Sequence, residues 1–310
     1  MKLFLPRYFL LFISFLTSTV VLSQQDSQYS QYMYNTVAVN PAYAGSRGVT
    51  SIFLMHRNQW VGLDGAPVTN VFSVNKSVAN SALGYGISVV NDRIGVSDDN
   101  TVSADVSYSI PLAASYKLSF GIKASANWLS VDYSRMTIRD PNDIILSQQN
   151  EIDNQFSPNV GVGVYLHSNK NYVGVSIPHF LETKRYDDNI SSTANDKMHF
   201  YFIAGSVFDL NSDWKFKPAL LTKLVQGAPL QIDVSANFLF NDKFTFGAGY
   251  RFNAAVTALV GFQVTKAWQI GYAYDAETTR LANYNSGSHE IFLRLELFSK
   301  YDKIVSPRFF

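Results

Sequence analysis

The chain has 310 residues, of which 47% are hydrophobic, 15% aromatic and 16% charged, with a net charge of +1 and no cysteine. The high aromatic content argues against a disordered protein, and the lack of cysteine excludes disulfides, thiolate metal sites and a cysteine nucleophile. A net charge this close to zero leaves no basic surface for nucleic acid.

Residues 1–23 have the pattern of a secretory signal peptide. Lys2 and Arg7 form a basic start, an apolar run over 9–15 follows, and residues 21–23 supply small side chains for cleavage. A transmembrane anchor is the alternative, but the apolar run is shorter than the ~18 residues that a membrane helix needs. We therefore expect cleavage after Ser23, which leaves a soluble exported protein or a membrane β-barrel.

Residues 24–48 precede the first predicted strand and are too polar to enter lipid. Tyr29, Tyr32 and Met33 nevertheless share one face at helical spacing, so this face must be buried on another surface. We expect a periplasmic or luminal segment that partly closes a barrel. The alternative is a periplasmic tail that only a partner protein orders.

Asn40-Pro41 ends any helix in this segment, because the residue before proline avoids the helical region. Gly45 and Gly48 permit turns that other residues resist. The segment is therefore expected to lead directly into the first strand.

From residue 49 onwards, apolar residues alternate with polar or small ones. In the stretch 243–252, for example, Phe244, Phe246 and Tyr250 share one face, and Thr245 and Arg251 share the other. The predicted strands cover 49–59, 68–76, 83–91, 100–110, 116–131, 158–167, 171–178, 197–209, 214–224, 230–240, 243–252, 255–264, 267–276 and 288–298.

These strands predict an all-β fold, a transmembrane antiparallel barrel of about 14 strands over residues 49–310. A soluble β-sandwich also alternates, but its exposed faces carry dense Lys and Glu. Here the polar faces carry Gly, Ser, Thr, Asn and isolated charges, as the lumen of an outer-membrane barrel does.

The connections predict the orientation. The three longest, 132–157, 179–196 and 277–287, all follow odd-numbered predicted strands, and most of the others are short. Outer-membrane barrels have short periplasmic turns and long external loops. With the first strand entering from the periplasm, the long loops lie at the cell surface.

Enzyme chemistry is not indicated. The five histidines have no partner at metal-ligand spacing, no EF-hand spacing is present, and Asp98-Asp99 and Asp187-Asp188 are interpreted as solvated loop charges. The glycine pairs at 84/86, 161/163 and 247/249 have period two and so share a barrel face; they are not phosphate loops. We expect no catalytic residue, metal, cofactor, nucleic acid or small-molecule substrate.

Two segments are more specific. One contains Asn40-Pro41-Ala42-Tyr43-Ala44-Gly45, and the other contains Arg57-x-Gln59-Trp60 followed by Asp64-Gly65-Ala66-Pro67. With Gln31-Tyr32-Met33 and the terminal Ser306-Pro307-Arg308-Phe309-Phe310, they resemble the PorP/SprF family of outer-membrane proteins, which is tied to the type IX secretion system and gliding motility.

The resemblance implies a non-enzymatic barrel that assists type IX secretion or the surface localisation of a partner, such as a large adhesin. It implies type IX secretion components, a secreted client and outer-membrane lipid as partners. The family motif marks a possible partner-binding set: Asn40, Pro41, Tyr43, Gly45, Arg57, Gln59, Trp60, Asp64, Gly65 and Pro67.

Alternatives remain open at this stage. Trp60 suits a membrane interface, residues 63–67 are a turn signal, and folding of the first hairpin explains the second motif as well as partner binding does. A general porin or solute channel has the same barrel, and only the state of the lumen separates it from a secretion helper.

Overall fold

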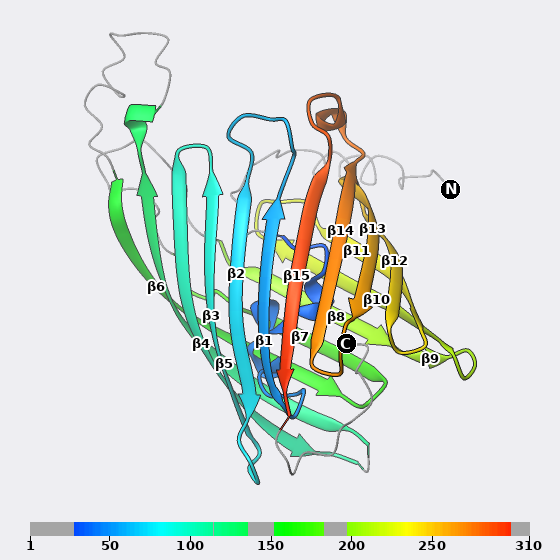
Figure 1. The fold of residues 1–310 in the computed structure, drawn as a ribbon. Helices are drawn as coiled ribbons and strands as arrows, with labels where there is room; N and C mark the ends of the chain where they lie inside the picture. The colour runs from blue at the N-terminus through cyan, green and yellow to red at the C-terminus, as the bar shows by residue number, and fades with distance from the viewer. Residues whose placement is uncertain (1–27, 114, 136–151, 183–196, 299–310) are drawn as a thin grey trace, which may run out of the picture.

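The computed structural model describes residues 28–113, 115–135, 152–182 and 197–298. In this part of the chain, 14 long antiparallel strands form one closed barrel (Figure 1). They are β1 (Thr50–Asn58), β2 (Val68–Ser77), β3 (Leu83–Ile94), β4 (Ser97–Pro111), β5 (Lys117–Val131), β6 (Ile152–His167), β7 (Asn171–Ile177), β8 (His199–Ser206), β10 (Trp214–Val225), β11 (Gln231–Phe240), β12 (Phe244–Arg251), β13 (Ala255–Gln263), β14 (Trp268–Glu277) and β15 (Ser288–Leu297). The two-residue strand β9 (Phe208–Asp209) continues β8 after Val207 and pairs with β10.

Closure of the barrel comes from the pairing of the first and last strands. Strand β1 pairs with β15 as well as with β2, so that Arg57 lies opposite Glu290. The two-residue β9 does not interrupt the wall, because β8 pairs directly with β10, which then pairs with β11. A closed barrel leaves no sheet edge, and each of the 14 long strands pairs with a strand on both sides. The predicted fold class is confirmed.

The two barrel faces follow the predicted alternation. On β5, Ile122 points outward and is 62% exposed, whereas the neighbouring Lys123 is buried inside. Residues Phe244, Phe246 and Tyr250 of β12 are exposed, and Thr245 and Arg251 are buried. The apolar outer surface suits lipid and the polar inner surface forms the lumen.

The two ends of the barrel differ in their connections. At the end where β1 begins, called here the short-turn end, the connections 78–82, 112–116, 168–170, 210–213, 241–243 and 264–267 have three to five residues. The opposite, long-loop end carries the connections 59–67, 132–151, 178–198 and 278–287. The predicted grouping of the longest connections at one end is therefore confirmed.

Two strands begin earlier than predicted. Strand β4 starts at Ser97 rather than at residue 100, and the larger difference is in β6. Strand β6 starts at Ile152 rather than at residue 158, because its pairing with β5 shifts register between Leu129 and Val131. Asn154 takes a positive φ of 51° at this irregularity. A β-bulge of this kind adds a residue to one strand and so breaks the period-two pattern.

In the part of the chain that the structure describes, five short helices lie outside the sheet. η1 (Tyr32–Tyr34), α2 (Thr36–Val39) and η2 (Pro41–Tyr43) precede β1, and η3 (Tyr133–Arg135) and η4 (Arg280–Asn283) belong to connections at the long-loop end. None of the helices in the described ranges is long and apolar enough to cross a membrane. Three predicted features lie outside the described residues: the signal peptide at 1–23, the loop charges Asp187-Asp188 and the terminal motif 306–310.

Candidate functional site

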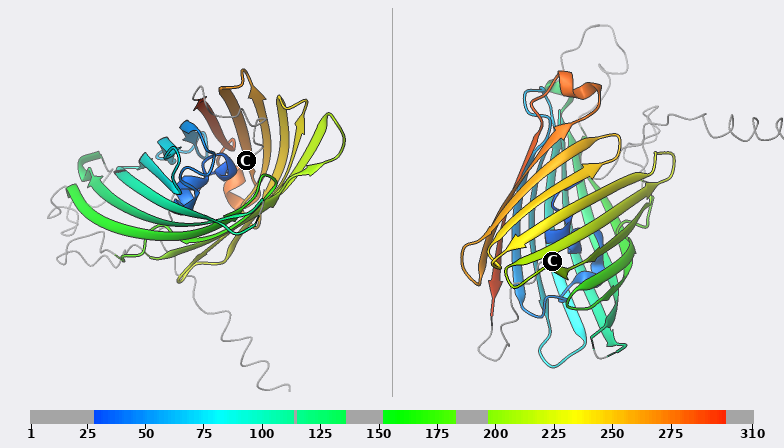
Figure 2. Two further views of the ribbon diagram at one scale, coloured as in Figure 1. Left: turned by 90° about the horizontal axis from the view of Figure 1, so that it is seen from below. Right: turned by 90° about the vertical axis from the view of Figure 1, so that its right-hand side faces the viewer.

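Residues 28–48, called here the luminal segment, lie inside the barrel (Figure 2). The segment begins near the long-loop end, where Ser30 and Gln31 bind Glu290 close to the start of β15. It ends near the short-turn end, where Gly45 lies against Ser77 at the end of β2. The chain therefore passes along the lumen before it enters β1.

A buried ion network holds the first residues of this segment. Arg57, which is 2% exposed, binds the Asp275 carboxylate through Nη2 at 2.7 Å and the Glu290 carboxylate through Nη1 at 3.0 Å. Glu290 also accepts hydrogen bonds from the backbone N–H groups of Ser30 and Gln31, both at 2.9 Å. A buried charge needs such partners, so the network fixes where the segment starts.

A second ion pair adds to this anchor. Arg251 Nε donates to both carboxylate oxygens of Asp233 at 3.1 and 3.2 Å, and the Gln28 side chain donates to Asp233 at 2.6 Å. The Ser30 hydroxyl donates to Asp275 at 2.5 Å. Four inward charges from β11, β12, β14 and β15 thus contact the luminal segment or a residue bound to it.

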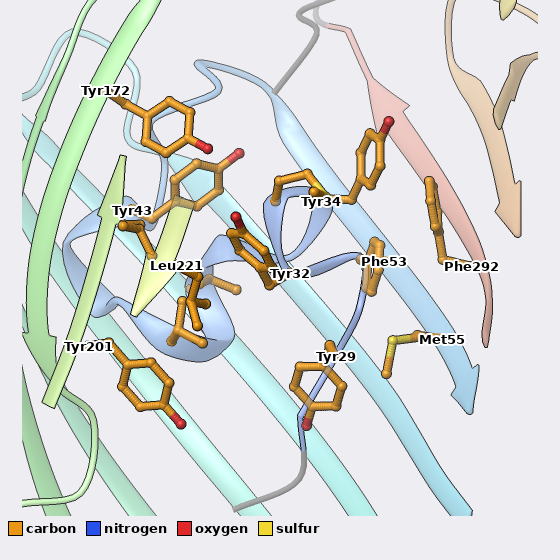
Figure 3. Close-up of a cluster of buried hydrophobic side chains, with 14 of the residues drawn as sticks. Tyr29, Tyr32, Tyr34, Tyr43, Phe53, Met55, Tyr172, Tyr201, Leu221 and Phe292 are labelled. Atoms are coloured by element: carbon orange, nitrogen blue, oxygen red, sulfur yellow. The ribbon is translucent and has the colours of Figure 1, made fainter. Parts of the chain in front are cut away.

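Aromatic packing holds the middle of the segment (Figure 3). The Tyr34 ring lies 4.7 Å from that of Phe292, and Phe292 stacks on Phe53 at 5.3 Å. The Arg294 guanidinium lies 5.3 Å from the Tyr34 ring and donates to its backbone carbonyl.

The Asn40-Pro41 motif ends the helix as predicted. Helix α2 stops at Val39 and Asn40 has extended backbone. The Asn40 side chain accepts a hydrogen bond from Ala42 N at 3.0 Å, which caps η2, and donates to the carbonyl of Val164 on β6 at 3.0 Å. One asparagine therefore closes the turn and attaches it to the barrel wall.

Inward-facing glycines make room for this motif. A Cβ added to Gly121 would lie 2.2 Å from the backbone nitrogen of Ala42, and one added to Gly163 would lie 2.2 Å from Asn40 Oδ1. A Cβ on Gly84 would lie 2.3 Å from the carbonyl oxygen of Ala44. The backbone of the luminal segment at Gly84 and Gly121, and the Asn40 side chain at Gly163, thus lie closer to β3, β5 and β6 than a side chain at these positions would allow.

Ser107 of β4 and Ser176 of β7 also bind this part of the luminal segment. Together with Gly84, Gly121 and Gly163 they are called here the glycine seat. Ser107 donates to the carbonyl of Ala44 and Ser176 to that of Val39, both at 2.6 Å. Tyr43 packs edge-on against Tyr165 of β6, with ring centroids 5.5 Å apart. The seat therefore combines close backbone contact with hydrogen bonds to carbonyls that the short helices leave free.

The last residues of the segment turn into β1. Gly45 and Gly48 have φ values of 72° and 73°, so both predicted turns need glycine. Arg47 between them forms an ion pair with Glu296 near the end of β15. This pair joins the exit of the luminal segment to the last strand, as Glu290 joins its start.

The residues of the second motif, 57–67, lie in two different parts of the barrel. Arg57 points into the lumen, whereas Gln59 and Trp60 lie in the connection after β1. The Gln59 backbone N–H donates to the carbonyl of Pro67 at 2.9 Å, and the Trp60 indole donates to Glu277 at 3.2 Å. These contacts fold the first hairpin and join it to the end of β14.

The tip of this connection, residues 62–65, is exposed. Gly65 has a φ of 75°, and its carbonyl accepts from Gly95 N at 2.9 Å. Asp64 and its neighbour Leu63 are exposed, and Pro67 is buried. Asp64 is thus the one member of the ten-residue motif set with an exposed charged side chain.

A cavity of about 220 Å³ lies between the luminal segment and the inner faces of β2 to β6. Its wall reaches Ile94 and Ser97 at the long-loop end, and Ala38 and Val39 of the luminal segment lie on its other side. In the described ranges, no group of three His, Asp or Glu side chains could hold a metal ion.

Sequence reasoning identified Arg57 and Asn40 but not their partners. Asp275, Glu290 and Arg251 are isolated charges in separate strands, and nothing in the sequence pairs them. One signal in the sequence was available, because each of the three is a charge on the polar face of an alternating strand. A charge that faces a lumen requires an opposite charge nearby, so each of them predicts a charged partner on another strand.

Solved structures of other barrels resemble this one in part. Omp33 of Acinetobacter baumannii is 10% identical, with 81% of this chain and 100% of that chain covered and a TM-score of 0.47. The P. putida toluene transporter TodX is 9% identical, with 84% and 92% covered and a TM-score of 0.46. No curated protein matches the sequence.

A family model covers most of the chain. The model described as "Type IX secretion system membrane protein PorP/SprF" matches residues 21–295. The match includes the luminal segment, its seat and all 14 long strands except the last residues of β15. The chain is therefore an outer-membrane β-barrel that belongs to the PorP/SprF family of type IX secretion system membrane proteins.

Proposed function

We propose that this barrel is not an enzyme and that it assists type IX secretion by bringing one secreted partner, such as a large adhesin, to the cell surface. Family membership supports an association with the secretion system. The observation that carries the proposal beyond the family is the luminal segment, because it occupies the space that a general porin keeps filled with water.

The contacts of the segment support a lasting occupant of the lumen. Asn40 and Ala42 are 0% exposed, and Tyr32, Met33 and Tyr34 are each at most 4% exposed. The ion network at one end and the glycine seat at the other hold the segment at both ends. A solute channel is therefore the less favoured function, although it shares the same barrel.

The proposed topology follows the rule for bacterial barrels. The signal peptide is removed after Ser23, the short-turn end faces the periplasm and the long-loop end faces outside. The motif residues then have two proposed roles. Asn40, Pro41, Tyr43, Gly45 and Arg57 hold the luminal segment, and Gln59, Trp60, Gly65 and Pro67 shape the external hairpin.

The external hairpin presents Leu63 and Asp64 for contact with the partner, because both are exposed at its tip. Affinity purification of the tagged protein from detergent-solubilised outer membrane should recover a secreted protein or a type IX component. The double variant Leu63→Ala, Asp64→Ala should lower this recovery, while Asn169→Ala at the short-turn end should not. Recovery of neither kind of protein would contradict the secretion role.

The state of the lumen is tested in planar bilayers. The intact protein should conduct poorly, and deletion of 24–35 should raise single-channel conductance, since it removes the ion-network contacts of Ser30 and Gln31. Heat-modifiable migration on a gel should show that the deleted form still folds as a barrel. An intact protein that already conducts like an open porin would favour the solute channel.

A further inference from the structure

The wall of the luminal cavity carries rows of hydroxyl and amide side chains across four neighbouring strands. In one row Ser88 lies opposite Ser103, Ser103 opposite Ser125, and Ser125 opposite Asn159. In the row above, Thr101 lies opposite Asn127 and Asn127 opposite Ser157. All of these residues line the cavity. Side chains that face each other across strands lie about 5 Å apart, so one small ligand can reach several.

Four of these hydroxyls have no hydrogen-bond partner among the described residues. They belong to Ser88, Ser103, Ser125 and Ser157, which are only 4%, 5%, 8% and 8% exposed. Buried hydroxyls are normally bonded within the protein, as Ser107 and Ser176 are in the same barrel. The four serines instead face the cavity, where only water or a ligand can satisfy them.

Three charged side chains of the cavity wall already have hydrogen-bond or ion-pair partners in the protein. Lys123 lies 3.4 Å from Asp105, Asp92 accepts from Thr69 at 2.6 Å, and Asp99 accepts from Asn127. An ionic ligand would have to compete with these contacts, so the free groups of the wall favour an uncharged ligand. Each free hydroxyl can both donate and accept, which matches a ligand that carries hydroxyls itself.

Aromatic and apolar side chains line the rest of the cavity. Tyr29 of the luminal segment and Tyr201 of β8 supply the rings, and Val71 of β2 and Leu129 of β5 supply apolar surface. A sugar ring has polar edges and two less polar faces, so it suits a site that combines hydroxyls with aromatic rings. The volume of about 220 Å³ is smaller than that of a typical drug site and fits a single ring rather than a long chain segment.

We propose that this cavity binds a neutral saccharide, one ring at a time, that enters from the long-loop end. A peptide strand is the less favoured ligand, because a cavity of about 220 Å³ has room for a single ring and not for a segment of several residues. The shared chemistry is an uncharged sugar unit, whether it comes from a surface polysaccharide or from a free oligosaccharide.

The test uses the full-length protein in detergent, probed by ligand-observed nuclear magnetic resonance. The probes are neutral trisaccharides of glucose, galactose and N-acetylglucosamine, the delipidated polysaccharide of the same cells, a Ser/Thr-rich hexapeptide and triethylene glycol, which has few donors. At least one sugar probe should bind. The double variant Ser103→Ala, Ser125→Ala should weaken that binding about tenfold, as expected for two lost neutral hydrogen bonds.

The matched control is Ser51→Ala. Ser51 is also a buried serine of the lumen, but it lies on β1 outside the cavity lining, so its removal should leave sugar binding unchanged. Heat-modifiable migration checks that each variant folds. Binding by the trisaccharides alone, or by the cell polysaccharide as well, identifies the source. Binding by the peptide alone, equal binding by triethylene glycol, or no sugar binding would overturn the proposal, whatever the outcome for secretion.

Discussion

The glycine seat makes a direct prediction about the lumen. In Gly121→Ala the new Cβ would lie 2.2 Å from Ala42 N and 2.4 Å from the carbonyl carbon of Pro41, and neither backbone atom can move alone. The luminal segment must therefore retreat from β5. Overpacking of this kind costs about 1–3 kcal/mol.

The expected size of this displacement follows from the hydrogen bonds that attach the luminal segment to the barrel wall near Gly121. Three hydrogen bonds of 3.0 Å or less join it to the wall here, from Asn40 to Val164, from Ser107 to Ala44 and from Ser176 to Val39, and a longer one runs from Lys123 to the Val37 carbonyl at 3.4 Å. At about 1 kcal/mol each the three shorter bonds contribute roughly 3 kcal/mol, so the overpacking cost cancels a third or more of their stabilisation. The displaced state should rise in population by about 5- to 150-fold.

Single-channel recording measures this change as more frequent or longer conducting events. The matched control is Gly86→Ala, because its Cβ would meet its nearest neighbour, Asn75 Cβ, at 3.4 Å, an ordinary contact. Both variants should insert and show heat-modifiable migration like the parent. If Gly121→Ala conducts no more than Gly86→Ala, the luminal segment does not limit conduction and the proposed plug is wrong.

Further predictions concern stability and topology. Glu290→Gln leaves Arg57 with one carboxylate and should lower the temperature of barrel unfolding in detergent, since breaking a buried pair costs about 3–5 kcal/mol. The control is Arg93→Gln, which removes an exposed ion pair and should change the free energy of unfolding by at most about 1 kcal/mol. Equal changes in the unfolding temperature of the two variants would contradict the burial of the Arg57–Glu290 pair. The protein has no cysteine, so a cysteine at Tyr284, which is 69% exposed, should react with an impermeant maleimide on intact cells, whereas one at Asn169 should not. The reverse pattern would invert the proposed orientation.

The barrel could be predicted from the sequence because the alternation of apolar and polar residues in each strand distinguishes its outward face from its inward face. Residues such as Phe246 and Thr245 alternate strictly, and lipid outside and a polar lumen inside make that alternation unambiguous. The start of β6 was missed because a bulge at Asn154 interrupts the period. A local irregularity of one residue is invisible to a pattern that relies on strict spacing.

The contacts of the site could not be predicted, because barrel closure creates them. Arg57 was singled out with Gln59 and Trp60, yet it points to Asp275 and Glu290, more than 200 positions away. The helical face expected for Tyr29, Tyr32 and Met33 is buried, but the first helix begins only at Tyr32. Sequence spacing identified which side chains need partners and not which partners they find.

The path of the luminal segment sets an order for assembly. The segment precedes β1 in the chain, and the barrel closes when β1 pairs with β15, as Arg57 and Glu290 lie 233 positions apart. Closing so long a loop is slow and comes late. Glu290 on β15 also binds Ser30 and Gln31. Strand β15 therefore both closes the barrel and binds the luminal segment. If the barrel closed before the segment was inside, the 21 residues of the segment would have to enter the lumen afterwards through the short-turn end.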